Sequence, residues 1–197
     1  MKQAMEELLA RVRACRVCEE HLPLGPRPVL RASSTARVLI VGQAPGTRVH
    51  ETGIPWNDPS GDRLRHWLGI DREAFYDASR IAIIPVGLCY PGKGVRGDMP
   101  PRPECAPLWM PDLLVLMPNL TLTVLAGGHA QAWHLGARRK RTMADTVAAW
   151  QDYLPRHFPL PHPSPRNILW FRRHPWFEAE VVPALRREFR AALSIGN

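Results

Sequence analysis

Short apolar runs recur along the chain, and glycine, proline or polar residues bound them. The first is Arg37-Val-Leu-Ile-Val41, which ends at Gly42, and the next two span residues 81–86 and 120–125. A fourth, weaker run lies near residues 157–160. Runs of this length flanked by turn residues predict buried strands. A strand covered on both faces has no solvent-facing side chains, so its sequence does not alternate between apolar and polar residues. The pattern therefore predicts about four strands.

Between these runs, apolar residues recur at helical spacing. Residues 2–15 carry Met5, Leu8, Leu9 and Val12 among charged residues, which predicts an amphipathic helix. Further helices are predicted near residues 62–68 and 111–117, after Gly128, and over residues 176–193. Strands that alternate with helices indicate an α/β fold, with a central, mostly parallel sheet of about four strands and helices on both faces. We expect one domain over residues 1–197.

The carboxyl ends of parallel strands lie at one edge of a sheet, and α/β folds bind their ligands beyond that edge. Four segments follow the predicted strands and should meet there. They are the loop at residues 42–46, the segment after Val86, the Gly127-Gly128 turn and the segment after Leu160. The sequence therefore predicts a binding site built from loops far apart in the chain.

The charge balance narrows the class of partner. Lys and Arg total 26 against 18 Asp and Glu, a net charge of +8. This balance fits a polyanion, with nucleic acid first and anionic membrane second, although a solvated basic surface has the same composition. The chain lacks an apolar stretch long enough to span a membrane, and its charged start lacks the apolar core of a signal peptide. We expect a cytoplasmic, monomeric protein that binds no membrane.

All four cysteines fall into two pairs, Cys15-x2-Cys18 and Cys89 with Cys105. In a cytoplasmic protein such cysteines are more often metal ligands or free thiols than disulfides. A two-residue gap lets two thiolates reach one metal centre, and both zinc and an iron–sulfur cluster accept four cysteines. Small buried thiols are the alternative. The pairing of every cysteine favours a structural metal centre that ties the N-terminal helix to the Pro-rich loop.

Two loop motifs directly follow predicted strands. Gly42-Gln43-Ala44-Pro45-Gly46 follows the first strand, and it is neither a P-loop nor the dinucleotide-binding G-x-G-x-x-G motif. His162-Pro-Ser164-Pro-Arg166-Asn167 follows the fourth. The prolines hold His162 stiffly, so that it can donate to an anion or a leaving group. Taken alone, each motif favours an ordinary tight turn over a functional loop.

Together, in this order and separation, the two motifs resemble the signature motifs of the uracil-DNA glycosylase superfamily. The nearest type is the iron–sulfur-containing family 4, whose pattern runs G-E-A-P-G, T-G-x-P-F, a cysteine pair and a late H-P-S. Thr52-Gly-Ile-Pro-Trp56 stands at the T-G-x-P-F spacing, and Val124-Leu-Ala-Gly-Gly128 is similar to the family's third strand and turn. The ending H-P-S-P-x-N is closer to family 5. The resemblance covers most of the chain.

The resemblance implies a DNA glycosylase of base excision repair. Such an enzyme flips a damaged base, uracil first, out of the helix and hydrolyses its N-glycosidic bond. Trp56 would stack on the flipped base, and the loop around Gln43 would hydrogen-bond the uracil edge. His162 would stabilise the negative charge on the departing base.

Further sites also follow from the resemblance. Ser164, Arg166 and Asn167 would contact the opened DNA strand. Arg172 and Arg173 lie among aromatic residues, a mixture typical of nucleic-acid surfaces and equally of solvated arginines beside a core. The cysteine match implies a [4Fe-4S] cluster, with structural zinc or no metal as alternatives. The implied cluster ligands are Cys15, Cys18, Cys89 and Cys105.

The chain departs from the family pattern in its first motif. Gln43 replaces the acid of family 4, and Ala44 stands where family 1 enzymes carry Asp. The motif therefore offers no carboxylate to orient water. Glu51, Asp58 and Asp62 lie close by in sequence, and the resemblance assigns the water to none of them.

A third departure concerns recognition of the base. Pro85 stands where family 4 has an Asn that reads the uracil edge, and proline offers no side-chain donor. The pocket must read its base differently or accept another, since sites built on hydrogen bonds lose strong discrimination without them. Asn57 is a candidate substitute by proximity alone.

Three functions are compatible with these features. The first is a glycosylase for uracil or for another deaminated base such as hypoxanthine or xanthine. The second is a DNA-binding protein of the same fold with little or no catalysis, which Gln43 and Pro85 would explain. The third is an unrelated hydrolase of small nucleosides, which ranks last because the chain has no G-x-S-x-G motif and no clear carboxylate pair.

Overall fold

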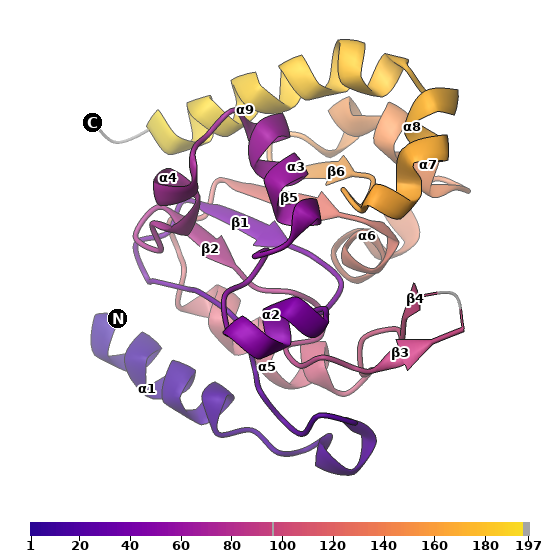
Figure 1. The fold of residues 1–197 in the computed structure, drawn as a ribbon. Helices are drawn as coiled ribbons and strands as arrows, with labels where there is room; N and C mark the ends of the chain where they lie inside the picture. Colours follow the sequence, from indigo (N-terminus) through magenta and orange to yellow (C-terminus); the bar gives the residue numbers. More distant parts are fainter. Residues whose placement is uncertain (96, 195–197) are drawn as a thin grey trace.

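A parallel sheet forms the centre of the computed structural model, which describes residues 1–95 and 97–194 (Figure 1). Its four strands are β1 (Val38–Val41), β2 (Ile81–Ile83), β5 (Leu122–Ala126) and β6 (His157–Leu160). They lie in the order β2-β1-β5-β6, and every neighbouring pair is parallel. The predicted α/β sheet is confirmed, including its fourth strand.

The central strand β1 is buried on both faces, as its unbroken apolar sequence predicts. Successive side chains of a strand point to opposite faces. Leu39 and Val41 therefore belong to one core cluster, and Val38 and Ile40 belong to the other. The sheet thus separates two hydrophobic cores, each of which needs its own cover of helices.

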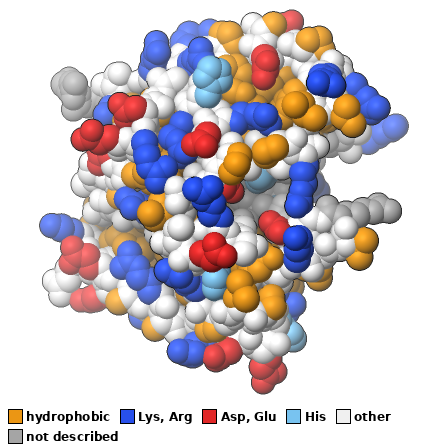
Figure 2. All heavy atoms as spheres, in the orientation of Figure 1, with side chains coloured by type: hydrophobic (Ala, Val, Ile, Leu, Met, Phe, Trp, Pro, Cys, Tyr) orange, Lys and Arg blue, Asp and Glu red, His pale blue; other side chains and the backbone are white. Residues whose placement is uncertain are grey.

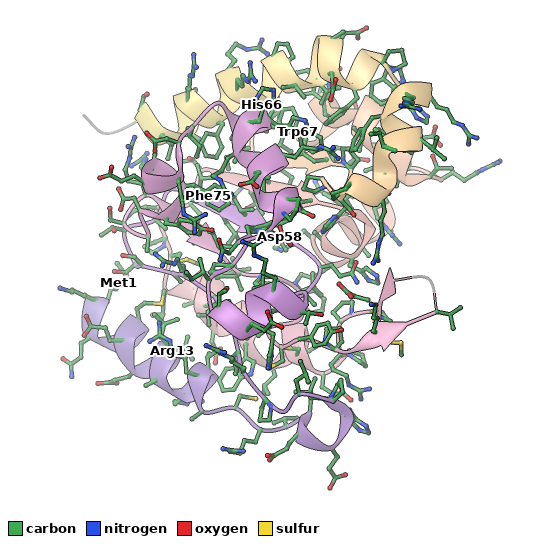
Figure 3. All side chains as sticks on the ribbon, in the orientation of Figure 1. Met1, Arg13, Asp58, His66, Trp67 and Phe75 are labelled. Carbon is green, nitrogen blue, oxygen red and sulfur yellow. The ribbon has the colours of Figure 1, made fainter. Side chains whose placement is uncertain are left out.

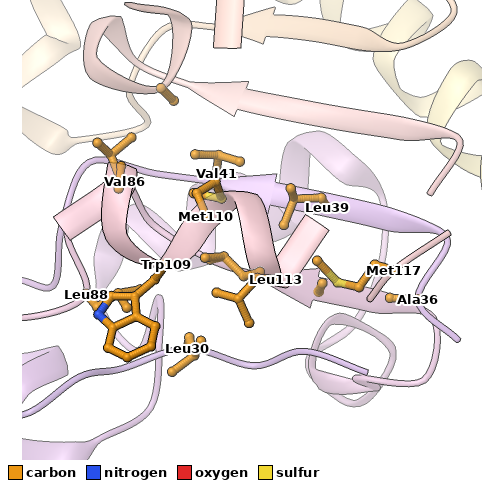
Figure 4. Close-up of a cluster of buried hydrophobic side chains, with 14 of the residues drawn as sticks. Leu30, Ala36, Leu39, Val41, Val86, Leu88, Trp109, Met110, Leu113 and Met117 are labelled. Atoms are coloured by element: carbon orange, nitrogen blue, oxygen red, sulfur yellow. The ribbon is translucent and has the colours of Figure 1, made fainter. Parts of the chain in front are cut away.

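Three helices contribute to the first core, which Figure 4 shows in close-up. They are α1 (Lys2–Arg13), α5 (Cys105–Val115) and α6 (Gly128–Leu135). Helix α1 buries Met5, Leu8, Leu9 and Val12, the four apolar positions of its sequence pattern. The prediction of an amphipathic N-terminal helix is therefore confirmed.

The opposite core is covered chiefly by α3 (Pro59–Leu68), α4 (Arg72–Tyr76) and α9 (Val182–Ser194). Figure 3 shows Asp58 at one end of α3 and His66 and Trp67 toward the other. At that second end, Arg186 of α9 donates to the carbonyl oxygens of His66 (2.8 Å) and Trp67 (3.1 Å). These bonds satisfy helix-end carbonyls and fix α9 against α3.

The remaining elements are short and surround the carboxyl edge of the sheet or link its layers. A turn of π-helix, Phe177–Val181, precedes α9. No helix in the described part of the chain is long and apolar enough to cross a membrane. The other short elements are η1 (Glu19–His21), α2 (Thr47–Thr52), β3 (Lys93–Gly94), β4 (Gly97–Asp98), η2 (Gly136–Arg138), α7 (Met143–Ala148), η3 (Trp150–Tyr153), η4 (Pro165–Asn167) and α8 (Ile168–Arg173).

Several element boundaries differ from the predictions, and two of these differences involve prolines. The predicted start of the helix at residue 111 is wrong, because α5 begins at Cys105 and contains Pro111. Strand β2 ends at Ile83, short of the predicted residue 86. The N–H groups of Ile84 and Val86 nevertheless donate to the carbonyls of Ile40 and Gly42, both at 3.0 Å. The intervening Pro85 continues the line of β2 just beyond its end. Because β2 is an edge strand, a missing N–H is tolerated there.

The second core gives a test of the fold. Phe158 of β6 is fully buried and stacks on Trp150, with ring centroids 5.0 Å apart. We expect Phe158→Ala to lower the free energy of unfolding by about 3–5 kcal/mol, because it leaves a cavity, and Phe158→Leu to lower it less. Urea denaturation followed by circular dichroism measures both.

Val115→Ala is the matched control, since Val115 is 75% exposed at the end of α5. It should change the free energy of unfolding by no more than about 0.5 kcal/mol. Equal effects of Phe158→Ala and Val115→Ala would contradict the placement of β6 in the core.

Candidate active site

A cavity of about 540 Å³ lies beyond the carboxyl ends of the strands. In Figure 2 the surface is hollowed between the helices at the upper right and the β3–β4 hairpin, with Lys and Arg side chains at its edges. The cavity combines three of the segments that the sequence places on one rim. Its lining residues are Val29, Gly42, Gln43, Ala44, Pro45, Gly46, Val49, Pro55, Trp56, Asp58, Ser60, Ile83, Pro85, Gly97, Asp98, His162, Ser164, Pro165, Arg166 and Asn167.

The first loop motif is held as a continuation of the sheet. The carbonyl of Gly42 accepts from the N–H of Val86 (3.0 Å), and that of Gln43 accepts from the N–H of Gly87 (2.8 Å). A β-carbon on Gly42 would come within 2.7 Å of the Trp56 indole. Glycine is therefore needed at this position, because any side chain would displace the aromatic ring that lies against it.

Trp56 has an unusual backbone conformation, with a φ of 56°. This left-handed conformation costs free energy in a non-glycine residue and persists only where its surroundings impose it. The surroundings come from α3. The Trp56 carbonyl accepts from Arg65 Nη1 (3.3 Å), and a β-carbon on Gly61 would overlap that carbonyl. Asp58 caps the same helix by accepting from the N–H of Gly61 (2.8 Å).

The His162 ring stacks beside that of Trp56 in the cavity wall, with ring centroids 5.6 Å apart and an interplanar angle of 29°. Room for it depends on Gly127, where a β-carbon would lie 3.1 Å from His162 Cβ. Burial lowers the pKa of His162 below its ordinary value of 6.5, and the carboxylates of Asp58 and Asp98 oppose this only in part. The imidazole is therefore mostly neutral at pH 7 and can donate one N–H.

The loop that carries His162 is tied down at both ends. Asn167 Nδ2 donates to the His162 carbonyl (2.8 Å). Arg63 Nη1 donates to the carbonyls of Pro163 (3.3 Å) and Ser164 (3.1 Å). The Arg63 guanidinium also lies over the Phe171 ring, 5.1 Å from its centroid. The sequence pattern does not single out Arg63, because the loop it binds lies about a hundred positions away.

Arg166 connects the His162 loop to the β3–β4 hairpin. Its backbone N–H donates to Ser164 Oγ (3.2 Å). Its guanidinium lies so close to Gly97 that a β-carbon there would be 2.5 Å from Nη1. Directly after β4, the carbonyl of Met99 accepts a hydrogen bond from Gln43 Nε2 of the first loop (3.2 Å). The hairpin is thus held between the two signature loops.

Two carboxylates line the cavity, Asp58 and Asp98. Of the three acids that lie near the first motif in sequence, only Asp58 is among the lining residues. Asp62 instead pairs with Arg65 at 2.6 Å. Asp98 carries no sequence signal for a site, because it comes from a short hairpin that only the fold brings to the first loop.

The structure leaves three of the expected site residues outside the cavity. Asn57 is not among the lining residues, and its Oδ1 accepts from Arg72 Nη2 (2.8 Å). Arg172 and Arg173 are exposed on α8, beyond the cavity. Pro85 does line the cavity, and this part of the wall therefore offers no side-chain hydrogen-bond donor.

The four cysteines line a second, separate cavity. All four thiols are free and partly buried. The N–H of Leu88 donates to Cys105 Sγ (3.3 Å), and the backbone of Arg27 hydrogen-bonds the Cys89 thiol. Burial raises the pKa of Cys89 to about 11 and that of Cys105 to about 12.

The spacing of these thiols bears on which metal would fit them. Over residues 1–95 and 97–194, no group of three or more His, Cys, Asp or Glu side chains is arranged to hold a metal ion. All four cysteines are nevertheless among the residues that line this one cavity. A single zinc ion requires sulfurs at about 2.3 Å from one centre.

A comparison with protein families finds a match over most of the chain. The family model of the uracil DNA glycosylase superfamily matches residues 31–186. This span contains both loop motifs, Trp56, the β3–β4 hairpin and the second cysteine pair, and it covers more than half of the chain. The chain therefore belongs to the uracil DNA glycosylase superfamily.

Proposed function

We propose that this protein is a DNA glycosylase that flips a deaminated base, uracil first, into the cavity and hydrolyses its bond to the sugar. One observation carries the proposal. The first loop motif, Trp56 and His162 line a single cavity beyond the carboxyl ends of the strands. The net charge of +8 suits DNA as the substrate.

Trp56 and the first loop would hold the flipped base. Stacking on an aromatic side chain contributes about 1–3 kcal/mol per base. The constraints on Trp56 from Gly42, Gly61 and Arg65 keep the indole in place before DNA arrives, which lowers the entropic cost of binding. Because Gln43 Nε2 is bound to Met99, its Oε1 and the loop backbone would contact the base edge.

His162 would supply the electrostatic part of catalysis. Breaking the N-glycosidic bond leaves negative charge on the base, and a fixed N–H donor stabilises it more than mobile water does. A neutral imidazole is such a donor, and the bonds from Asn167 and Arg63 hold its loop rigid. Ser164, Arg166 and Asn167 would contact the opened strand at the mouth of the cavity, with Arg172 and Arg173 reaching more distant phosphates.

The cysteines would hold a [4Fe-4S] cluster, the feature that relates the chain to family 4 within the superfamily. Cys15 and Cys18 follow α1, Cys89 follows β2, and Cys105 begins α5. The N–H groups that hydrogen-bond Cys105 and Cys89 also suit cluster sulfurs, whose charge such bonds stabilise. The cluster would join α1 to the rest of the fold far from the cavity, as a structural element.

A panel of oligonucleotides that each carry one damaged base tests the lesion specificity. We expect the purified protein to release uracil from single- or double-stranded DNA and to leave alkali-labile abasic sites. Hypoxanthine and xanthine belong in the panel, because Pro85 removes a hydrogen-bonding side chain from the base pocket. Free nucleosides test the alternative hydrolase.

Salt-sensitive DNA binding without release of any of the three bases would contradict glycosylase activity. That result would favour the DNA-binding protein without catalysis. Turnover of free nucleosides alone would instead favour a nucleoside hydrolase.

His162→Ala should lower the single-turnover rate of base release about 100- to 1,000-fold, the usual effect of removing one donor to a developing anion. Since the pKa of His162 lies below 6.5, the ratio of wild-type to variant rates should stay constant from pH 7 to pH 9. A ratio that falls across this range would show that the imidazolium is the active form. Quenched-flow sampling of the product measures the rates.

The cysteine cluster makes a prediction about metal content. Protein prepared anaerobically should show broad visible absorbance and about four irons per chain. Cys15→Ser should lose most of the iron and lower the free energy of unfolding, whereas Val115→Ala should keep the wild-type iron content. A colourless wild-type protein without metal by elemental analysis would contradict the cluster.

A further inference from the structure

The cavity contains a carboxylate that no sequence motif supplies. Hydrolysis requires a water molecule to attack the sugar C1′ atom, and a carboxylate that accepts the water's proton makes it a better nucleophile. The first loop has Gln43 and Ala44 at the two positions where other branches carry an acid. If base release occurs as proposed above, the carboxylate must come from elsewhere in the fold.

We infer that Asp98, at the end of the β3–β4 hairpin, is the catalytic carboxylate that binds and activates the attacking water. Asp98 lines the cavity together with His162 and the first loop. A β-carbon on Gly46 would lie 3.5 Å from Asp98 Oδ2, so the carboxylate lies against the end of that loop. The position is exposed at the cavity mouth, where incoming DNA would cover it.

Asp58 is the other carboxylate on the cavity wall, and its surroundings give it a different function. Its Oδ1 accepts from the N–H of Gly61 at 2.8 Å and caps α3. That helix in turn fixes the Trp56 carbonyl through Arg65. Asp58 is therefore part of the structure that shapes the stacking platform, and it lies on the α3 side of the cavity.

Gln43 holds the hairpin in place. Its Nε2 donates to the carbonyl of Met99, the residue after Asp98, and the N–H of Met99 donates to the carbonyl of Gly92 (2.8 Å). A carboxylate at position 43 could not donate to a carbonyl. The amide that replaces the family's acid thus anchors the segment that brings Asp98 to the cavity, and Gln43 is a positioning residue for it.

The step balances as a hydrolysis. The C1′–N bond breaks, and its electron pair stays on the base, where His162 stabilises the charge. The water oxygen bonds to C1′, and one water proton passes to the Asp98 carboxylate. The base anion then takes a proton from solvent and Asp98 releases one, so that each released base consumes one water.

The test compares Asp98→Asn with Asp58→Asn and Glu51→Gln, using single-turnover base release and DNA affinity by fluorescence anisotropy. Asp98→Asn should lower the rate about 100-fold or more, as loss of a general base does, with no more than about twofold weaker DNA binding. The loss of rate in Asp58→Asn should be at least about tenfold smaller than the loss in Asp98→Asn, since Asn also caps helices. Glu51 is exposed outside the cavity, and Glu51→Gln should keep the wild-type rate.

A wild-type rate in Asp98→Asn, or a larger loss in Asp58→Asn, would overturn the assignment of Asp98 while base release by the wild-type protein still stands. If the wild-type protein releases no base from any lesion, the proposed function fails and this inference falls with it. Circular dichroism and thermal melting confirm that each variant is folded.

A double-mutant cycle tests Gln43. If Gln43 acts through Asp98, then Gln43→Met should slow base release less in the Asp98→Asn background than in the wild-type protein, because only the contact of Gln43 with the base edge is left to lose. A double variant that shows the full product of the two single losses would overturn the positioning function of Gln43.

Discussion

The candidate active site depends on the confinement of the Trp56 indole and backbone. Gly42 leaves room for the ring, Gly61 leaves room for the carbonyl, and Arg65 donates to that carbonyl. A non-glycine residue with a φ of 56° would normally relax to a negative φ, and these contacts hold Trp56 in its left-handed conformation. The result is an aromatic platform fixed beside His162 before any ligand is present.

The other side of the cavity is built by long-range contacts of the same kind. Arg63 and Asn167 hold the His162 loop, and Arg166 lies against Gly97 of the hairpin. Gln43 binds the chain just after Asp98. Each of these side chains bonds to a backbone carbonyl or packs against a glycine, so the loops are positioned by one another and by the sheet. Such preorganisation is what catalysis by charge stabilisation requires.

The cysteine region is separate from the cavity that contains His162. Its cavity is lined by residues that follow α1, by the Pro-rich segment and by the start of α5. The proposed cluster would join these segments, because a metal centre stabilises the folded state that brings its ligands together. The stability of this part of the fold and the chemistry of the cavity are therefore separable.

Local pattern determined much of the fold. Apolar runs bounded by glycine, proline or polar residues predict buried strands wherever a strand is covered on both faces, and β1, β5 and most of β6 follow that rule. The amphipathic spacing of Met5, Leu8, Leu9 and Val12 likewise determined α1. Where prolines interrupt the pattern, in α5 and after β2, the boundaries were wrong, because tertiary packing outweighs local propensity there.

For the site, the sequence by itself determined the residues that lie in motifs. Gly42–Gly46, Trp56 and His162 follow strands or a fixed spacing, and parallel strands bring their carboxyl ends together in any such sheet. Only the tertiary structure decided the rest. It placed Asp98 and Arg63 at the site and kept Asn57, Arg172 and Arg173 away from the cavity. The reason is physical: these contacts join segments distant in sequence, and no local pattern encodes which hairpin or helix face closes over a loop.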